Sequence, residues 1–529
     1  MALQPPFYPI VYLRGYAGGQ SAVEETVSTP YMGFNLGATK LRQTYEGKPE
    51  KYVFESPLVR LIKDHDYDDC YRNGDYPQSG ESIPARSIWI SRYYEVVSEE
   101  LGEGEPQTMR AFAEDLRALI LRIRDHVCGT DTQQQDAFKV HLVAHSMGGL
   151  IARCYLQTLC TLGARDEEGQ PDDQKNQALA LSKTGGVPLV AKVFTYGTPH
   201  NGIELLGVNV PNLGPLDTFQ SKVFNRKVMR DYLSLPAKTP KNKAVNSLNN
   251  SFDPNRFFCF IGTNYKDYTV AMGITRRTTG AMSDGLVMCK NAWVQGAPRA
   301  YAHRAHSGWY GLVNSEEGYQ NLRRFLFGDV RVDVFLDVDK VTFPKPIQGH
   351  IDKGKTIRAV YYIETVARIR GERIKLHERI KDQGSAIMRK DTAFSGPKAN
   401  AIFLMSGFLN SKNRSPKVAD QAMNFAVDVR VLVPEYEIDY KYWFDDYVEG
   451  ATLYNEQFNF FVRFTADGSV NLKYGTQSKN GAGVGKRNPT VKADGDVKTF
   501  SIPIGFSPTA AQEPHGKLRG TLLIKAQRI

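Results

Sequence analysis

The feature that most constrains the fold of this chain is the five-residue segment 144–148 (AHSMG). An apolar run of strand character, 138–144, leads into it, and a segment of helical character follows it directly. A strand that turns at once into a helix crowds the positions two before and two after the turn, so Ala144 and Gly148 must be small. The pattern predicts a strained turn that holds the Ser146 hydroxyl above a sheet and at a helix N-terminus, as a nucleophile requires.

Short apolar runs alternate with helical patterns on both sides of this turn. The runs of strand character lie at 8–13, 87–94, 138–144, 190–196 and 256–261. Thr108 could cap a helix whose apolar residues recur at helical spacing as far as Val127. Strands separated by helices imply a parallel sheet with helices on both faces, so residues 1–330 are expected to form an α/β domain. The polar segment 164–177 is predicted to be a loop.

The character of the sequence changes after Gly328. Short β-rich segments, several of which alternate apolar and polar residues, lie at 331–341, 356–369, 423–433, 459–464, 499–504 and 518–526. This pattern predicts an all-β, sandwich-like accessory domain over residues 331–529. A chain of 529 residues also exceeds the usual size of one hydrophobic core, which favours two domains.

The net charge of +10 lies almost wholly in the second part of the chain. Residues 331–529 contain 31 Lys and Arg against 22 Asp and Glu, whereas residues 1–330 contain 36 against 35. A solvated surface is the simpler interpretation, and docking on an anionic membrane surface is the alternative. No aromatic-basic motif indicates a nucleic acid partner, and the sequence does not indicate an oligomeric state.

The cysteines and the N-terminus bear on where the chain is made. None of the six cysteines forms a C-x-x-C pair, so reduced, buried thiols in a reducing compartment are the simplest interpretation. The first nine residues have neither the charged start nor the apolar core of a secretory signal. We expect a protein that is cytoplasmic as synthesised, and leaderless secretion is compatible with that expectation.

The segment 63–70 (KDHDYDDC) contains many oxygen ligands that a metal ion could use. Its spacing matches no calcium loop, and we interpret it as a solvated acidic loop. We therefore expect neither a metal ion nor a cofactor.

Four motifs resemble those of bacterial lipases and esterases of the α/β-hydrolase superfamily. The segment 145–153 (HSMGGLIAR) resembles their nucleophile elbow, and 197–202 (GTPHNG) resembles a signature that follows their next strand. The segment 283–287 (SDGLV) resembles the one that supplies their catalytic aspartate, and 14–19 (RGYAGG) resembles their oxyanion loop. The resemblance covers about the first 330 residues and implies an α/β-hydrolase fold with carboxylic ester hydrolase activity.

A catalytic triad follows from this resemblance and from the chain order Ser, Asp, His. The resemblance makes Ser146 the nucleophile and Asp284 the carboxylate that orients the base, with Asp267 as its rival. His303 and His306 are the histidines between Asp284 and residue 330. The spacing from Asp284 to His306 is similar to that of the lipase family, so His306 is the predicted base and His303 the alternative.

The elbow and the resemblance also predict an oxyanion hole. The elbow supplies the backbone N–H of Met147, and the resemblance implies that the loop after the first strand supplies that of Tyr16. Arg14 stands where these lipases have a histidine, so the anchoring of this loop differs from theirs.

The insertion at 203–235 lies where lids and pocket walls are inserted in hydrolases. We expect cap material there, with Leu205, Leu206 and Val208 in contact with substrate. A surface helix packed on the sheet fits the same periodicity.

These observations predict a serine hydrolase that cleaves carboxylic esters through an acyl-enzyme, with lipid esters as the expected substrates. One alternative is an interaction protein that uses the hydrolase fold as a scaffold. Another is an acyltransferase whose acceptor is not water.

Overall fold

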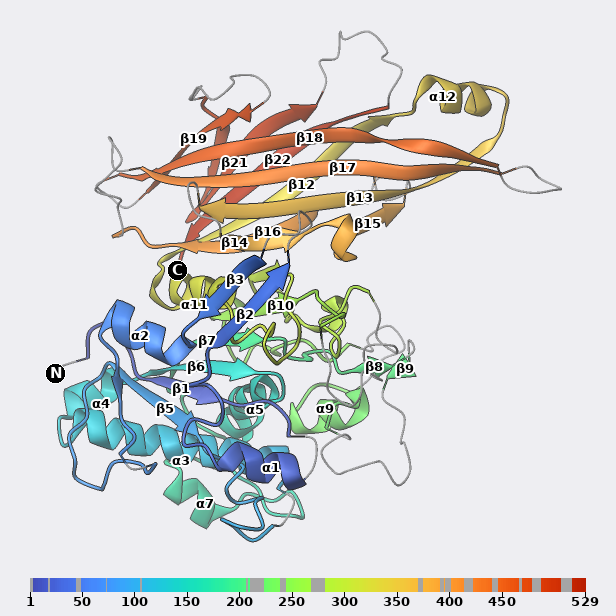
Figure 1. The fold of residues 1–529 in the computed structure, drawn as a ribbon. Helices are drawn as coiled ribbons and strands as arrows, with labels where there is room; N and C mark the ends of the chain where they lie inside the picture. The colour runs from blue at the N-terminus through green and yellow to red at the C-terminus, as the bar shows by residue number, and fades with distance from the viewer. Residues whose placement is uncertain are drawn as a thin grey trace. The chain divides into compact units, whose positions relative to one another are not determined.

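The computed structural model divides the chain into two compact units (Figure 1). The first contains residues 1–299 and 304–327, and the second contains 300–303 and 328–529. That residues 1–330 and 331–529 fold as separate domains stays a prediction. The residues that the structure describes are 3–17, 20–43, 49–72, 74–104, 107–205, 208–209, 223–237, 244–267, 281–369, 374–390, 394, 401–412, 422–439, 446–465, 469–477, 487–505 and 516–529.

The central strands of the first unit belong to a seven-stranded sheet. Its order is β11 (Arg299–Ala302), β10 (Phe257–Gly262), β7 (Val190–Tyr196), β6 (Val140–His145), β1 (Ile10–Leu13), β5 (Ser87–Ser91) and β4 (Asp68–Asp69). Neighbouring strands from β4 to β10 pair in parallel. Most of these strands are apolar and buried along nearly their whole length, as is typical of a parallel sheet covered on both faces.

Helices cover both faces of this sheet. Figure 1 shows α2 (Pro57–His65) and α11 (Glu316–Phe327) on one side of it and α3 (Met109–Cys128) on the other. Thr108 caps α3 as predicted, because its side chain accepts a hydrogen bond from the backbone N–H of Ala111. Among the described residues of the first unit, the other helices of at least six residues are α1 (Gln20–Val27), α4 (Thr132–Ala137), α5 (Gly148–Cys154), α7 (Asp173–Ala178) and α9 (Arg226–Tyr232).

Two local predictions for this unit need correction. The segment of helical character expected directly after the turn is α5 followed by a π-helical stretch, η1 (Tyr155–Leu159). The loop expected over 164–177 contains most of α7, because the side chain of Asp172 accepts a hydrogen bond from the backbone N–H of Lys175 and so caps a helix there.

The order of the strands determines where a site can form. The chain begins at β1 in the middle of the sheet, adds β4 and β5 on one side, and then adds β6, β7 and β10 on the other. In open parallel sheets the usual ligand position is at the carboxyl ends of the strands where the order reverses, which are β1 and β6 here. The segments after those two ends are the loop that begins at Arg14 and the turn at Ser146.

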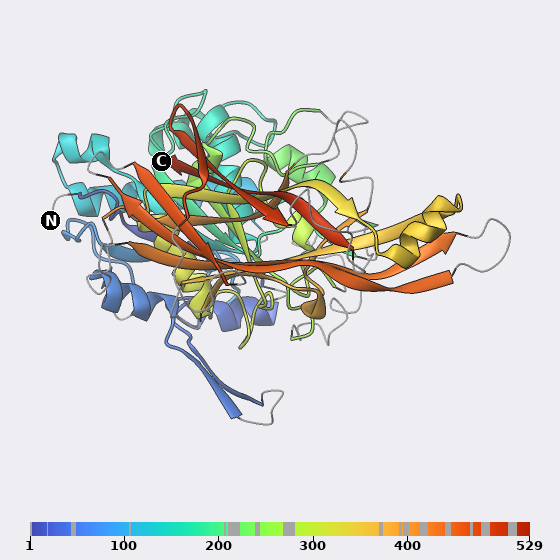
Figure 2. The same cartoon turned by 90° about the horizontal axis from the view of Figure 1, so that it is seen from above.

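The second unit contains two antiparallel sheets. The five-stranded sheet has the order β16 (Ile402–Leu409), β12 (Val330–Thr342), β22 (Lys517–Arg528), β21 (Val497–Gly505) and β20 (Thr490–Asp494). The six-stranded sheet has the order β14 (Lys375–Arg379), β13 (Thr356–Ile369), β17 (Met423–Asp439), β18 (Asp446–Phe464) and β19 (Val470–Thr476), and β15 (Ile387–Lys390) also pairs with β13. Figure 2 shows the long strands of this unit from above.

The two sheets pack against each other as a β-sandwich. One buried cluster takes side chains from both of them, for example Leu336 of β12, Ile363 of β13, Val431 of β17 and Leu522 of β22. Alternate residues of each strand point into this cluster, which explains the alternation seen in the sequence. The predicted fold class is therefore confirmed: an α/β-hydrolase type of sheet, flanked by helices, is followed by an all-β sandwich.

Some elements of the two units were not predicted from the sequence. They include the hairpin of β2 (Ala38–Gln43) and β3 (Pro49–Phe54) in the first unit, and helix α12 (Lys345–Asp352) in the second. Within the described residues, no helix has both the length and the apolar character needed to cross a membrane.

Candidate active site

Ser146 lies at the turn between β6 and α5 with a positive φ of 51°. Its backbone N–H donates to the carbonyl of Tyr196 at 2.9 Å. A Cβ on Gly148 would lie 2.5 Å from the carbonyl oxygen of Leu13, so that position admits no side chain. The turn therefore has the strained backbone and the crowding that the sequence pattern predicts for a nucleophile elbow.

The structure brings Ser146, His306 and Asp284 together in one line of hydrogen bonds. The Ser146 Oγ lies 2.9 Å from Nε2 of His306, and Nδ1 of His306 lies 2.8 Å from Oδ2 of Asp284. An ionised carboxylate only accepts, so Nδ1 carries the proton and Nε2 presents its lone pair to the hydroxyl. All three residues are at least 97% buried. Such a line can move a proton from the hydroxyl to the imidazole.

Backbone groups hold Asp284 in place. Its Oδ1 accepts hydrogen bonds from the backbone N–H groups of Leu286 at 3.0 Å and Val287 at 2.8 Å. Its carbonyl accepts one from the backbone N–H of His306 at 2.9 Å, which ties the two loops to each other. The segment that the sequence identified by resemblance thus forms a tight turn around its own carboxylate.

Gly197, the first residue of the GTPHNG motif, lies directly against this pair. Its φ is +55°, and a Cβ there would lie 2.9 Å from Oδ2 of Asp284 and 3.2 Å from Nδ1 of His306. A side chain at this position would displace the carboxylate from the imidazole. The geometry therefore gives a physical reason for a glycine that sequence reasoning noted only by resemblance.

His145 supports the loop that carries His306. Its Nε2–H donates to the carbonyl of His306 at 2.9 Å, and the two ring centroids are 4.9 Å apart. Burial lowers the pKa of His145 to about 3, so the ring is neutral and can act as this donor. The sequence placed His145 beside the nucleophile. It gave no signal that the side chain would reach the His306 loop.

The loop after β1 lies against the nucleophile as an oxyanion loop would. A Cβ on Gly15 would lie 2.8 Å from Cβ of Ser146, so the backbone approaches the serine as closely as it can. The backbone N–H of Ala17 already donates to the hydroxyl of Tyr94 at 2.9 Å. The N–H of Tyr16, between these two residues, is the one that the sequence assigns to the oxyanion.

Arg14 anchors this loop where the resembling lipases have a histidine. Its Nη1 donates to the carbonyl of Met32 at 2.5 Å, and its carbonyl accepts from the hydroxyl of Tyr93 at 2.7 Å. The arginine thus ties the first residue of the loop to the segment that precedes β2.

The alternatives for the base and the carboxylate lie elsewhere. His306, rather than His303, bonds both Ser146 and Asp284. Asp267 accepts from the side-chain amide of Asn264 at 2.6 Å. The histidine of the GTPHNG motif, His200, is fully buried and lies 3.1 Å from the hydroxyl of Thr195.

The predicted cap is described only in part. Leu206 lies outside the described residues. Leu205 and Val208 pair with each other in the two-stranded sheet of β8 (Glu204–Leu205) and β9 (Val208–Asn209), but their side chains lie outside the described part of the structure. Their contact with substrate therefore stays a prediction. The rings of Tyr16 and Phe224 pack edge to face with centroids 5.8 Å apart, which brings this insertion next to the oxyanion loop.

The acidic segment 63–70 takes part in protein contacts. Asp64 accepts from the hydroxyl of Tyr319 at 2.8 Å and from Arg60 at 3.1 Å, and Asp69 accepts from the hydroxyl of Tyr31. Across the described ranges, no group of three or more His, Cys, Asp and Glu residues is arranged to hold a metal ion. All six cysteines are buried, and none of them forms a disulfide.

Comparison with known proteins finds similarity at the level of structure. No protein-family model and no curated protein matches the chain. A lipase from Bacillus licheniformis is similar at 14% identity and a TM-score of 0.29, over 61% of this chain and 93% of that one. The phospholipase PlaB from Legionella pneumophila is similar at 11% identity and a TM-score of 0.30, over 84% and 91%. A putative cell surface hydrolase from Lactobacillus plantarum is similar at 10% identity and a TM-score of 0.20, over 60% and 89%.

Proposed function

We propose that this protein is a serine hydrolase that cleaves carboxylic esters, with lipid esters as its substrates. The observation that carries the proposal is the buried line from Ser146 through His306 to Asp284, with distances of 2.9 and 2.8 Å. Hydrogen bonds of this length, with the hydroxyl on a strained turn at a helix N-terminus, suit an activated nucleophile.

The reaction begins when Oγ of Ser146 attacks the carbonyl carbon of the ester while Nε2 of His306 takes the hydroxyl proton. Asp284 keeps Nδ1 protonated and stabilises the imidazolium that forms. The backbone N–H groups of Tyr16 and Met147 stabilise the oxyanion. His306 then gives its proton to the leaving alcohol, which leaves an acyl group on Ser146. A water molecule repeats the sequence and releases the carboxylic acid.

An exposed tryptophan beside the site supports lipid esters as substrates. Trp309 is 60% exposed and lies three residues after His306. The loop between them is fixed by hydrogen bonds from the N–H of Ala305 to the carbonyl of Tyr310 at 2.8 Å and from the N–H of Leu312 to the carbonyl of Ala305 at 3.0 Å. An indole held on a firm loop is suited to the boundary between water and lipid, where tryptophan is enriched.

Labelling with a fluorophosphonate probe tests the catalytic part of the proposal. The wild-type protein should form a covalent adduct at Ser146, and Ser146→Ala should form none. Ser28→Ala is the control, because Ser28 is exposed and its hydroxyl bonds only the nearby carbonyl of Glu25 in the described structure. If the wild-type protein is not labelled, or if Ser146→Ala is labelled equally, the catalytic proposal is contradicted. The alternative of an interaction protein then remains.

Activity on vesicles tests the lipid part. Trp309→Ala should lower hydrolysis of phospholipid vesicles by about tenfold, the effect of one lost interfacial anchor, and leave hydrolysis of a soluble p-nitrophenyl ester unchanged. Val187→Ala removes another exposed apolar side chain of the first unit, 74% exposed, and serves as the matched control. Equal losses on both substrates would contradict a lipid-docking role for Trp309.

A further inference from the structure

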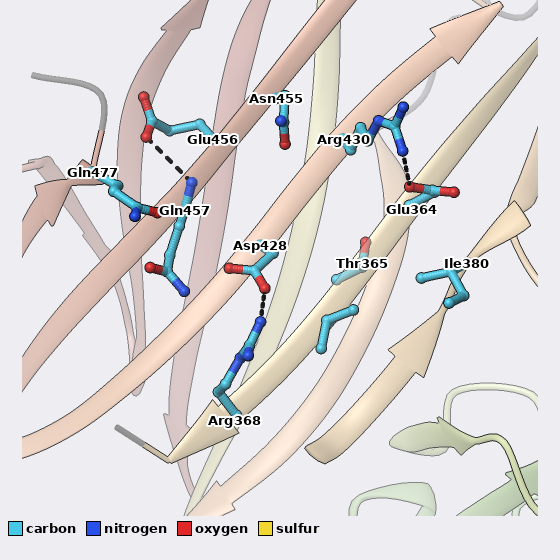
Figure 3. A pocket seen from close by; sticks show the side chains of 11 residues that line it. Glu364, Thr365, Arg368, Ile380, Asp428, Arg430, Asn455, Glu456, Gln457 and Gln477 are labelled. Atoms are coloured by element: carbon cyan, nitrogen blue, oxygen red, sulfur yellow. Dashed lines mark hydrogen bonds and ion pairs between the residues drawn. The ribbon is translucent and has the colours of Figure 1, made fainter. Parts of the chain in front are cut away.

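A polar hollow lies on the outer face of the six-stranded sheet, within the second unit (Figure 3). Its volume is 660 Å³, which is within the range of small-molecule sites. Asp428 and Arg430 of β17 line it, and they alternate with Val429 and Val431, which belong to the sandwich core. The polar residues therefore face away from the core. We call this feature the sheet hollow.

The register of three strands gathers the polar groups of the sheet hollow. Glu364 of β13 lies opposite Arg430 of β17, which lies opposite Asn455 of β18. In the adjacent row, Asp428 lies opposite Gln457 of β18. Residues opposite each other in an antiparallel sheet share one face, so a carboxylate, a guanidinium and an amide stand side by side.

Two ion pairs cross the sheet hollow, as Figure 3 shows. Arg368 pairs with Asp428, and Arg430 pairs with Glu364 at 3.5 Å. The pair of Arg368 and Asp428 does not use all of the polar atoms of the two side chains. Nε of Arg368 and Oδ1 of Asp428 are buried, and neither has a hydrogen-bond partner among the residues that the structure describes.

Buried polar atoms without partners are rare in folded proteins, and a ligand is one established reason for them. Here the unused groups are a donor in Arg368 and an acceptor in Asp428. A ligand that both donates and accepts would satisfy both, and an alcohol hydroxyl is the simplest such group.

The charges of the sheet hollow exclude other ligand classes. An anion would meet three carboxylates, those of Glu364, Asp428 and Glu456, against two guanidinium groups that are already paired. A quaternary ammonium group needs aromatic rings around it, and none of the described residues that line the hollow is aromatic. An apolar ligand would leave the many polar groups unpaired. A neutral compound with several hydroxyl groups remains.

We propose that the sheet hollow is a binding site for a neutral saccharide. Its hydroxyls donate to Asp428 and Glu364, accept from Arg368, and exchange hydrogen bonds with the amides of Asn455 and Gln457. The same chemistry comes from two sources, a free oligosaccharide or the sugar headgroup of a glycolipid. The proposal does not rest on the hydrolase function, because every residue named here lies in the second unit.

Calorimetry on the full chain tests the proposal, with Ser146→Ala as background so that no lipid is hydrolysed. One arm titrates maltose, cellobiose and lactose to about 10 mM. The other uses phosphatidylcholine vesicles with and without glucosyl diacylglycerol. We expect binding in at least one arm, and that arm identifies the source of the sugar. No binding in either arm overturns the proposal.

Substitutions then locate the binding. Asp428→Asn and Gln457→Ala should each weaken it by about tenfold, because each removes a hydrogen bond to the ligand. Glu437→Gln is the matched control, because Glu437 pairs with Arg358 across the same two strands and does not line the hollow. Unchanged affinity in a Gln457→Ala protein with a normal unfolding temperature overturns the proposal even where Asp428→Asn fails to fold.

Discussion

The active site of the first unit and the sheet hollow of the second use similar side chains in different ways. In the active site, each polar group of Ser146, His306 and Asp284 faces the next, and backbone N–H groups occupy the other oxygen of the carboxylate. In the sheet hollow, the ion pair of Arg368 and Asp428 leaves a donor and an acceptor unused. The first arrangement fixes one geometry for moving a proton. The second keeps hydrogen-bonding capacity for a molecule from outside.

Glycines let chain segments touch in both units. A Cβ on Gly520 of β22 would lie 2.1 Å from the carbonyl oxygen of Asp337. In the active site a Cβ on Gly15, Gly148 or Gly197 would lie within 3 Å of another atom, so chain segments touch there without side chains between them. At Gly349 of α12, in the second unit, a Cβ would meet no atom within 4 Å. In the active site, this close packing helps to hold the reacting groups within tenths of an ångström of one another.

The largest difference should appear when one carboxylate in each unit is neutralised. Asp284→Asn removes the acceptor that keeps Nδ1 of His306 protonated, and should lower kcat on a soluble ester by about 10⁴-fold. Asp428→Asn in the sheet hollow should change the same kcat by less than about twofold, because the described hydrogen bonds of Ser146, His306 and Asp284 do not include Asp428. Steady-state kinetics of both variants checks this. A large loss of kcat in Asp428→Asn would break the comparison.

The next effect concerns the glycine that touches the nucleophile. In Gly15→Ala the new methyl group would lie 2.8 Å from Cβ of Ser146 and 2.9 Å from Nδ1 of His145. The oxyanion loop must move away, which should lower kcat by about 100-fold with less effect on KM. Gly349→Ala is the control and should raise the free energy of unfolding by about 0.5–1 kcal/mol, since alanine favours a helix. Unchanged kcat in Gly15→Ala would contradict the close packing.

The smallest effect is a loss of stability in acid. Burial lowers the pKa values of His141 and His145 to about 3, against an ordinary value of 6.5. Below pH 6.5 the unfolded chain takes up protons that the folded protein excludes, so stability falls as the pH falls. Between pH 7 and pH 5 each histidine should contribute a loss of about 2 kcal/mol in the free energy of unfolding.

Denaturant unfolding of His141→Gln measures one of these contributions. Glutamine keeps a donor for the carbonyl of Pro6, which lies 2.8 Å from Nε2 of His141, but it does not titrate. The loss between pH 7 and pH 5 should shrink by about 2 kcal/mol in this variant. An equal loss in variant and wild type would assign the acid sensitivity to other groups.

Much of the fold was predictable because burial leaves a clear pattern in the sequence. The strands β7 and β13 have the predicted bounds, since one is a continuous buried run and the other alternates regularly. β18 begins 13 residues before its predicted start, because its first part carries polar side chains that break the alternation. The hairpin of β2 and β3 lacks such a pattern and was missed.

The candidate site was predictable where chemistry dictates the residue type. It was missed where it depends on contacts between residues that are far apart in the sequence. The chemistry of the site requires the residue types of Ser146, Asp284 and His306. Steric crowding requires the small residues around them. The hydrogen bond from His145 to the His306 carbonyl joins residues 161 positions apart, which no local pattern reports. The sheet hollow depends on the register of three strands, and register follows from tertiary packing.

Because Ser146 has a positive φ, selection for stability acts against this serine. A serine in the left-handed region costs on the order of 1 kcal/mol, which glycine would not incur. Most replacements of a buried residue weaken a protein, yet removing this side chain should relieve the chain. Selection for thermal stability alone would therefore favour sequences that lack Ser146. The serine is retained only where catalytic activity is also selected.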